Sequence, residues 1–348
     1  MKKGIFFIPV YKESKPYNEI LDEVISSTVS AEKMGLSEAY YGEHITDRFE
    51  KIASSLMMIA SVSHLTNKIK LGSLTTNLNF YKPAALAAWI STVDNMTKGR
   101  FIMGIGAGAN QTDLESLDLL EQKNYELMLE LESLVRKLLN SKDLVNLKTD
   151  NYKVSTLKTG NPELGLGYFN GLYKQRDNLD IIMPALGKGS YNVKMCAKNK
   201  WSIAISNFCS DEIVKDHIEN YLNNSPLEKK DALKKIRLTK LLFLNESQKD
   251  AEKYAFDENS PYMEVIDTIF TKLKTFKRHN CFGENVNCTL DAAKKVLFHG
   301  TPEKAKDYIS SINNQFGELG SVVFVSVPKT NNRIFDESLK LFSKELNV

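Results

Sequence analysis

Short apolar runs alternate with longer amphipathic segments along the whole chain. Eight of the runs have the length, the β-branched and aromatic content and the flanking turn residues of buried strands. Their ranges are Gly4–Val10, Ser37–Gly42, Ile69–Thr76, Arg100–Gly106, Leu179–Ala185, Trp201–Ser206, Ile236–Asn245 and Ser321–Val327. Strands separated by helices in this way predict a parallel sheet, either a closed barrel or a doubly wound sheet.

The segments between the strands carry the helical period. In the first of them one helix face is formed by Ile20, Val24, Ser27, Ala31 and Met34. A second helix is expected over Leu114–Leu139, where one face carries Leu127, Leu131, Leu134 and Leu138. Spacings of three and four residues are typical of a helix that buries one side.

The turns after the strands distinguish the two kinds of parallel sheet. A doubly wound nucleotide-binding fold places a glycine-rich turn after its first strand, but Tyr11–Pro16 contains no glycine. The glycines at Gly104, Gly106 and Gly108 follow the fourth strand and do not have the dinucleotide-binding spacing. Eight strands therefore favour a (β/α)8 TIM barrel, an α/β fold that typically needs about 250 residues.

The chain shows no linker or break in composition, so residues 1–348 are expected to form a single barrel domain with two insertions. The first, about 143–178, holds glycines among aromatics and is expected to form an irregular hairpin. The second, about 250–297, follows the seventh strand. A long segment at that end of a barrel is expected to be a mobile or disordered lid.

Charge and hydropathy exclude several kinds of partner. The chain has 46 basic and 43 acidic residues and a net charge of +3, which favours neither nucleic acid nor an acidic membrane surface. No apolar run approaches the roughly 18 residues that span a membrane. The apolar stretch near the N-terminus is too short for a signal peptide, so a cytoplasmic location is expected.

The four cysteines do not indicate a metal site. They form no Cys-x-x-Cys pair, which in a chain of this length favours reduced thiols. His279, Cys281 and Cys288 lie near one another in sequence, but their spacing does not match a zinc knuckle. No metal is expected.

The second predicted strand ends just before Glu43 and His44. In TIM barrels, catalytic groups lie at these C-terminal strand ends. A neutral imidazole at a strand end can act as a general acid or base near pH 7. Glu43 can orient it or bind a cofactor. From position alone, a structural histidine at the barrel rim is an equally good interpretation.

Two further strand ends offer backbone rather than side chains. Gly104–Asn110 lacks bulky groups, which lets a flat ring approach the backbone closely. Gly187–Asn192 follows the fifth strand and opens a helix, so its N–H groups with Lys188 and Ser190 can form an anion cradle. The alternative for Gly187–Asn192 is a solvated glycine-rich turn.

The sequence resembles the bacterial luciferase-like (LLM class) flavin-dependent monooxygenases. Three of its segments are similar to sequence motifs of that family and occur in the same order: Glu43-His44, Leu71–Thr76 and Val93–Arg100. The resemblance is strong over residues 35–110 and thin over the two insertions. Val93–Arg100 contains the most recognisable string, Asp-x-Met-Thr-x-Gly-Arg, which we interpret as structural. Gly300–Glu303 also matches the family, but helix capping explains each of its residues.

The resemblance implies an FMN-dependent monooxygenase (an oxidoreductase). Reduced FMN, supplied by a separate flavin reductase, would meet O2 as co-substrate and oxygenate a small organic substrate through a C4a-peroxyflavin. His44 and Glu43 would be the catalytic residues. The isoalloxazine would lie against Leu74, Thr75, Thr76, Gly106, Ala107 and Asn110, with a cis peptide expected at Leu74–Thr75. The phosphate would be held by Lys188, Gly189, Ser190 and Asn192.

The chain also departs from the family pattern. Ile45 stands where relatives often have histidine or phenylalanine, and Ala107 stands where some have arginine. Two alternatives stay open. An F420-dependent hydride-transfer oxidoreductase would use the same barrel, and a non-catalytic flavin-binding luciferase-like subunit is compatible with the lack of polar groups at Gly106 and Ala107. Relatives commonly pair, so a homodimer through Ser54–Ala60 and Ala84–Ile90 is expected, with a heterodimer as the alternative.

Overall fold

The computed structural model describes residues 1–8, 10, 15–169, 171, 178–277, 279–327 and 333–345. The eight predicted strands are all present, as β1 (Lys2–Phe7), β2 (Glu38–Tyr41), β3 (Lys70–Ser73), β5 (Phe101–Gly106), β8 (Asp180–Ala185), β9 (Ser202–Ile205), β10 (Ile236–Leu244) and β12 (Ser321–Ser326). Along the sheet they follow the order β10-β12-β1-β2-β3-β5-β8-β9, and a pairing of β10 with β9 closes the ring. The predicted TIM barrel is confirmed.

The register of the first and last strands agrees with this closure. β1 runs parallel to β12, with Lys2 opposite Ser321 and Phe7 opposite Ser326. Two short strands were not predicted: β4 (Thr76–Asn77), which pairs with β5, and β11 (Leu297–Gly300), which pairs with the second half of β10. Strand β11 was not predicted because it is only four residues long and begins directly after helix α11 (Thr289–Val296), with no turn residues between them.

Helices connect the strands. They are α1 (Tyr17–Lys33), α2 (Ser55–Ser63), α3 (Pro83–Met96), α4 (Gln111–Ser116), α5 (Asn124–Leu139), α6 (Tyr191–Lys198), α7 (Asp211–Asn224), α8 (Lys229–Leu233), α9 (Gln248–Ala255), α10 (Pro261–Thr275), α11 (Thr289–Val296), α12 (Pro302–Phe316) and α13 (Arg333–Glu345), with 3₁₀ turns η1 (Leu78–Phe80), η2 (Pro162–Leu164) and η3 (His279–Phe282). Among the described residues, none of these helices has the length and hydropathy to cross a bilayer.

The chain divides into two compact units. Unit 1 comprises Met1–Tyr40, Arg48–Lys51 and Ile182–Val348, and unit 2 comprises Tyr41–Asp47 and Ile52–Ile181. The prediction of a single domain stays a prediction.

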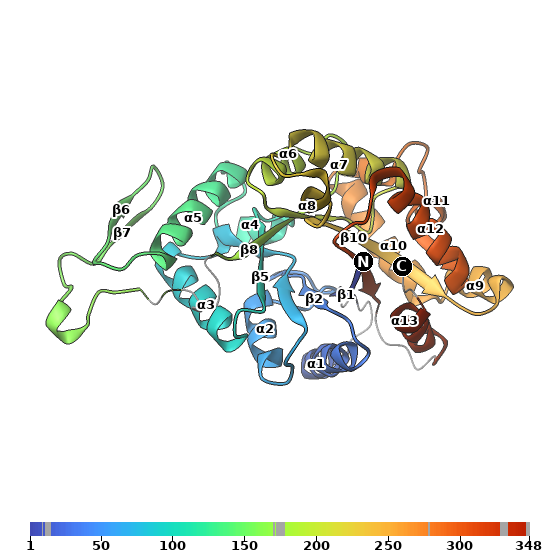
Figure 1. The fold of residues 1–348 in the computed structure, drawn as a ribbon, viewed down its shortest axis with the longest axis horizontal. Helices are drawn as coiled ribbons and strands as arrows, with labels where there is room; N and C mark the ends of the chain where they lie inside the picture. Colours follow the sequence, from blue (N-terminus) through green and yellow to red (C-terminus); the bar gives the residue numbers. More distant parts are fainter. Residues whose placement is uncertain are drawn as a thin grey trace. The chain divides into compact units, whose positions relative to one another are not determined.

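In unit 2 the first insertion contains the expected hairpin. Strands β6 (Asn146–Lys148) and β7 (Lys153–Ser155) pair antiparallel. Figure 1 shows this hairpin and the following turn extending away from α3 and α5. The turn exposes Leu157, Leu164 and Leu166. Residues 170 and 172–177, the rest of the predicted insertion, lie outside the described residues.

Also in unit 2, the helix predicted over Leu114–Leu139 is two helices, α4 and α5. The break follows Leu117, and Asp118 there has a left-handed φ of 58° that an α-helix cannot accommodate. Of the predicted leucine face of α5, Leu131, Leu134 and Leu138 are buried, and Leu127 is half-buried.

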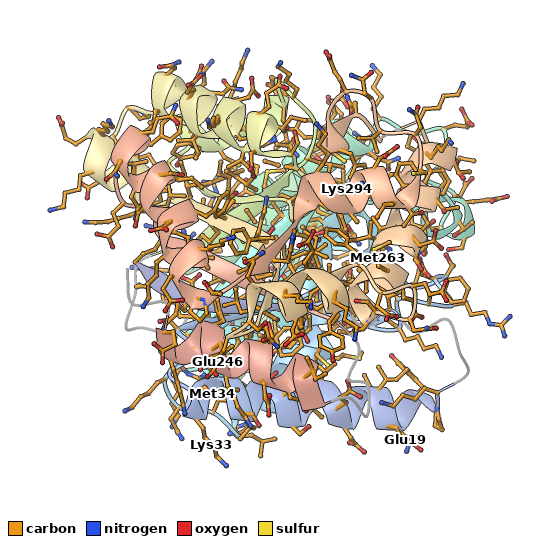
Figure 2. All side chains as sticks on the ribbon, turned by 90° about the vertical axis from the view of Figure 1, so that its right-hand side faces the viewer. Glu19, Lys33, Met34, Glu246, Met263 and Lys294 are labelled. Carbon is orange, nitrogen blue, oxygen red and sulfur yellow. The ribbon has the colours of Figure 1, made fainter. Side chains whose placement is uncertain are left out.

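In unit 1 the helix face predicted for α1 is buried at Ile20, Val24 and Ala31. Met34 is only half-buried, because α1 ends at Lys33 and Met34 is its C-cap. Figure 2 shows Glu19 and Lys33 at opposite ends of this helix, where an acid and a base favour the helix dipole.

The second insertion also belongs to unit 1. Its described residues are folded rather than disordered, and the expectation of a mobile lid stays a prediction. They form α9, α10, η3 and α11, and α10 packs against α11. Val265, Ile266 and Phe270 of α10 are buried, as is Val296 of α11. This segment buries apolar faces as the barrel helices do.

Candidate functional site

Glu43 follows the end of β2 in unit 2, and its side chain is buried. Oε2 accepts hydrogen bonds from the Ser55 amide at 3.0 Å, the Ser55 hydroxyl at 3.0 Å and the Tyr81 hydroxyl at 2.9 Å. Oε1 accepts from the Asn77 amide at 3.0 Å. The carboxylate therefore ties the first turn of α2 to the segment that follows the third strand.

This environment sets the protonation of Glu43. Burial raises the pKa of the Glu43 carboxyl above its ordinary value, while hydrogen bonds from Asn77, Ser55 and Tyr81 act in the opposite direction. Burial and the nearby Glu43 carboxylate also raise the pKa of Tyr81 well above its ordinary value. Glu43 is thus enclosed by donors, which suits a residue that fixes backbone better than one that exchanges protons.

His44 is the accessible member of the pair. Its side chain is 26% exposed, and Nδ1 lies 3.2 Å from Oδ2 of Asp113, whose side chain is 1% exposed. The backbone amide of His44 donates to the Ile52 carbonyl at 2.9 Å. A buried carboxylate against one ring nitrogen fixes the tautomer and orientation of an imidazole.

Asp113 lies in the first turn of α4, just after β5. Its Oδ1 accepts a hydrogen bond from the Thr46 amide at 2.8 Å, and the Thr46 hydroxyl also donates to it. Burial alone would raise the pKa of Asp113, but hydrogen bonds from His44 and Thr46 outweigh it, and the pKa lies below its ordinary value. Asp113 is therefore ionised at neutral pH and accepts the proton of His44 Nδ1.

The peptide bond between Leu74 and Thr75 is cis, as predicted. The Leu74 amide donates to the Tyr41 carbonyl at 2.7 Å, which holds this bond beside the end of β2. Gly106 lies opposite: a Cβ added there would be 2.3 Å from Thr75 Oγ1 and 2.8 Å from Asn77 Oδ1. Only glycine fits at this position without displacing Thr75.

The residues predicted to lie against a flavin ring have different surroundings. Leu74, Thr75, Gly106 and Ala107 are half-buried, whereas Thr76 is buried. The Thr76 hydroxyl lies 3.0 Å from Ser55 Oγ, next to Glu43.

Asn110 is the N-cap of α4, with Oδ1 accepting from the Thr112 amide at 3.2 Å. Asn79 Nδ2 donates to the Ala107 carbonyl at 3.1 Å and fixes that turn. The half-buried backbone at Leu74–Thr75, with glycine opposite, fits a flat ring system such as isoalloxazine.

The predicted phosphate cradle belongs to unit 1, and its donors already have acidic partners. The Lys188 ammonium lies 2.6 Å from Glu212 Oε1, and the Gly189 amide donates to Asp216 Oδ2 at 2.9 Å. The pair with Glu212 raises the pKa of Lys188.

The other two cradle residues offer less. Asn192 Nδ2 donates to the Pro184 carbonyl at 3.2 Å, and Ser190 is the N-cap of α6 without a side-chain cap bond. A phosphate here would compete with the carboxylates of Glu212 and Asp216, so this part of the site stays a prediction.

Sequence reasoning missed Asp113, Asn77 and Tyr81. Asp113 carried a signal, because it opens a helix directly after a glycine-rich turn at a barrel strand end. The expected helix began at Leu114 and left Asp113 outside it. Nothing in the sequence points Asn77 and Tyr81 towards Glu43, because that contact depends on the path of the chain after the cis peptide.

Comparison with known proteins agrees with the fold. Residues 1–162 match the family model of the luciferase-like monooxygenases. The oxygenating constituent of 3,6-diketocamphane monooxygenase from Pseudomonas putida, a type II Baeyer-Villiger monooxygenase solved with FMN, has the same fold. The TM-score is 0.85 at 17% identity, over 99% of this chain and 97% of that one. Residues 1–162 thus resemble the luciferase-like monooxygenases, and the resemblance is confirmed over that part of the chain.

Particular relatives cover the chain to different extents. The chain is 21% identical over 367 residues to 2,5-diketocamphane 1,2-monooxygenase 1 of Pseudomonas putida, covering 99% of this chain and 98% of that protein. It is 26% identical over 147 residues to limonene 1,2-monooxygenase of Rhodococcus erythropolis, covering 42% of this chain and 38% of that protein. An F420-dependent secondary alcohol dehydrogenase shares the fold with a TM-score of 0.69 at 14% identity, over 99% of this chain and 98% of that one.

Proposed function

We propose that the protein is an FMN-dependent monooxygenase that oxygenates a small organic substrate with O2. The observation that carries the proposal is the contact between His44 Nδ1 and Asp113 Oδ2, beside half-buried backbone that fits a flavin ring. The relatives named as diketocamphane and limonene monooxygenases support an apolar cyclic compound as the substrate.

His44 is the group that moves a proton. Asp113 holds Nδ1, so the ring exchanges protons through Nε2, and the Asp113 carboxylate stabilises the imidazolium form. Losing such a general acid or base typically costs a factor of about 10²–10⁴ in rate. Glu43 acts as a positioning residue, because its oxygens are engaged by Ser55, Asn77 and Tyr81.

The surface proposed to contact the flavin ring consists mainly of backbone and carries no charged side chain. Thr75, Gly106 and Ala107 would lie against the isoalloxazine and exclude water from that face, and Leu74 would shape its edge. Reduced FMN, when bound, would supply the O2-activating chemistry that the polypeptide lacks. Lys188, Gly189, Ser190 and Asn192 are proposed to hold its phosphate.

The partners follow from this chemistry. A separate flavin reductase would supply reduced FMN in the cytoplasm. We propose a homodimer through α2 and α3, where Met57 is 73% and Trp89 46% exposed. Light scattering should give a dimer for the wild type and a monomer for Met57→Glu/Trp89→Glu. A wild-type monomer at micromolar concentration would remove the dimer and leave the activity untouched.

A binding titration followed by turnover tests the function. FMN, FAD and F420 are titrated into the protein, and O2 consumption is then followed with reduced FMN and cyclic ketones or terpenes. FMN should bind most tightly, and one substrate class should convert O2 consumption into product. Preference for F420 would favour hydride transfer. FMN binding without any product would favour a non-catalytic subunit.

A further inference from the structure

A cavity of about 810 Å³ lies within unit 1, at the strand ends opposite to those that carry catalytic groups in this fold. It is lined by Lys2 at the start of β1, Glu38 at the start of β2 and Arg237 at the start of β10, among others. This volume is in the range of small-molecule sites. No residue of the proposed oxygenase site lines it.

The lining is strongly cationic. Its basic side chains are Lys2, Lys229, Lys230, Lys234 and Arg237, and its acidic ones are Glu38 and Glu318. Lys234 is 3.3 Å from Asp231, and Glu318 is 2.5 Å from the α-amino group of Met1. The α-amino group of Met1, and to a smaller extent Lys230 and Lys234, lower the pKa of the Glu318 carboxyl. Within ion-pair distance, the described part of the chain gives Lys2, Lys229 and Lys230 no acidic partner of their own.

Arg237 is a buried cation in this lining, with 9% of its surface exposed. Nη1 donates to Ser202 Oγ at 2.8 Å and to the Lys234 carbonyl at 3.2 Å, and Nη2 donates to Glu38 Oε1 at 3.2 Å. Nε has no hydrogen-bond partner among the described residues. Nε is closed off from solvent, so a ligand in the cavity would meet the positive charge of the guanidinium rather than this atom.

Glu38 does not cancel this charge. Besides Arg237, its carboxylate accepts from the Tyr40 hydroxyl at 2.9 Å and the Ser321 hydroxyl at 3.0 Å. Its oxygens are engaged, so the cavity does not offer a cation site. The exposed lysines of the lining, Lys2, Lys229 and Lys230, remain available to a ligand.

The rest of the lining is apolar. Leu233, Phe316 and Leu319 contribute it, and each is buried. The lysine stems add further methylene surface. An inorganic anion would leave these walls in contact with water, whereas a ligand with a hydrocarbon part would cover them.

We propose that this cavity binds an organic anion that has an apolar body, such as a medium-chain carboxylate. The head group would lie against Arg237 and the paired lysines Lys229 and Lys230, and the hydrocarbon would lie along Leu233, Phe316 and Leu319. The inference does not depend on the proposed oxygenase activity.

Calorimetric titration of the full chain tests it with four probes: octanoate, octyl phosphate, octylammonium and acetate. Octanoate should bind about tenfold or more tightly than octylammonium, which has the same tail and the opposite charge, and than acetate, which lacks the tail. Octyl phosphate binding more tightly than octanoate would identify a phosphate head as the preferred one. Equal binding of octanoate and octylammonium, or of octanoate and acetate, would overturn the proposal.

Two matched variants locate the binding. Lys229→Glu/Lys230→Glu should weaken octanoate about tenfold or more. The control is Lys294→Glu/Lys295→Glu, an exposed lysine pair on α11 outside the cavity lining (Figure 2), which makes the same change in net charge. It should leave the affinity unchanged. Equal weakening by both variants would show an effect of overall charge and overturn the site, as would loss of octanoate binding in His44→Ala alone.

Discussion

His44 Nδ1 and Asp113 Oδ2 lie 3.2 Å apart although 69 residues separate them in sequence. The contact joins the end of β2 to the first turn of α4, and Thr46 binds the second oxygen of the same carboxylate. The imidazole is therefore held on one side by a group that accepts and never donates at neutral pH.

Asp113→Asn should lower turnover by up to about 10⁴-fold, as loss of the carboxylate that orients an acid/base histidine does in a catalytic triad. It should also change acid stability. Because the folded pKa of Asp113 lies below its ordinary value, its ionised form stabilises the fold above about pH 4, and this contribution is lost as the pH falls further. Urea unfolding between pH 3 and 7 should therefore show a steeper acid loss in the wild type than in the variant. Parallel curves would contradict the pKa direction.

His44→Ala should leave folding and FMN affinity nearly unchanged and lower product formation by about 10²–10⁴. Product and H2O2 are measured together, because O2 consumption can continue without oxygen transfer. Ile45→Ala is the control, since Ile45 is the exposed neighbour of His44 on the same loop. Wild-type product yield from His44→Ala would show that His44 is a rim histidine.

Glu43→Gln should destabilise the protein by about 1–3 kcal/mol, because an amide cannot accept from donors on both of its ends. The cost should depend on pH. The folded pKa of Glu43 is raised, so the wild type is favoured at low pH and loses this contribution as the pH rises through the folded value. The difference from the variant should be larger at pH 5 than at pH 8. A difference that grows with pH would contradict this assignment.

Gly106→Ala should weaken flavin binding and cost about 1–3 kcal/mol of stability, as overpacking typically does. The new Cβ would meet Thr75 Oγ1 at 2.3 Å and Asn77 Oδ1 at 2.8 Å. Gly171→Ala is the control, because its Cβ would meet only the Leu139 carbonyl at 3.4 Å, an ordinary van der Waals contact. Thermal unfolding and FMN titration of both variants provide the comparison. Equal thermal stability and equal FMN affinity of the two variants would show that the Thr75 side chain changes rotamer at no cost.

Lys188→Glu should weaken FMN by about tenfold or more and leave riboflavin nearly unaffected, because only FMN carries a phosphate. Glu212→Gln should do the reverse and strengthen FMN, since it removes the carboxylate 2.6 Å from the Lys188 ammonium. Lys194→Glu, an exposed change on α6, controls for net charge. If Lys188→Glu weakens FMN and riboflavin alike, the phosphate binds elsewhere.

The barrel was predictable because each strand is a compact apolar run whose ends are marked by turn residues. The run Ile236–Leu244 is buried at every position, and its sequence reads as strand throughout. The cis bond at Leu74–Thr75 followed from the resemblance and is present. Segments without such a pattern were interpreted less well, and the helices of residues 250–297 were not predicted.

The site was predictable only where neighbours in sequence form it. Glu43 and His44 are adjacent, so their strand-end position could be read directly. Asp113 and Tyr81 reach them through separate loops, and no periodicity encodes that approach. The acidic partners of Lys188 and Gly189 were missed for the same reason: Glu212 and Asp216 come from α7.

Glu43 accepts four hydrogen bonds, so substitutions at Glu43 and at His44 have different consequences during evolution. A descendant that exchanged His44 would keep the architecture around its ring-binding backbone and could survive as a binding subunit. A descendant that exchanged Glu43 would loosen that architecture first. A relative that retains only the glutamate thus keeps an intact binding scaffold, and a relative that also retains the histidine keeps the group needed for catalysis.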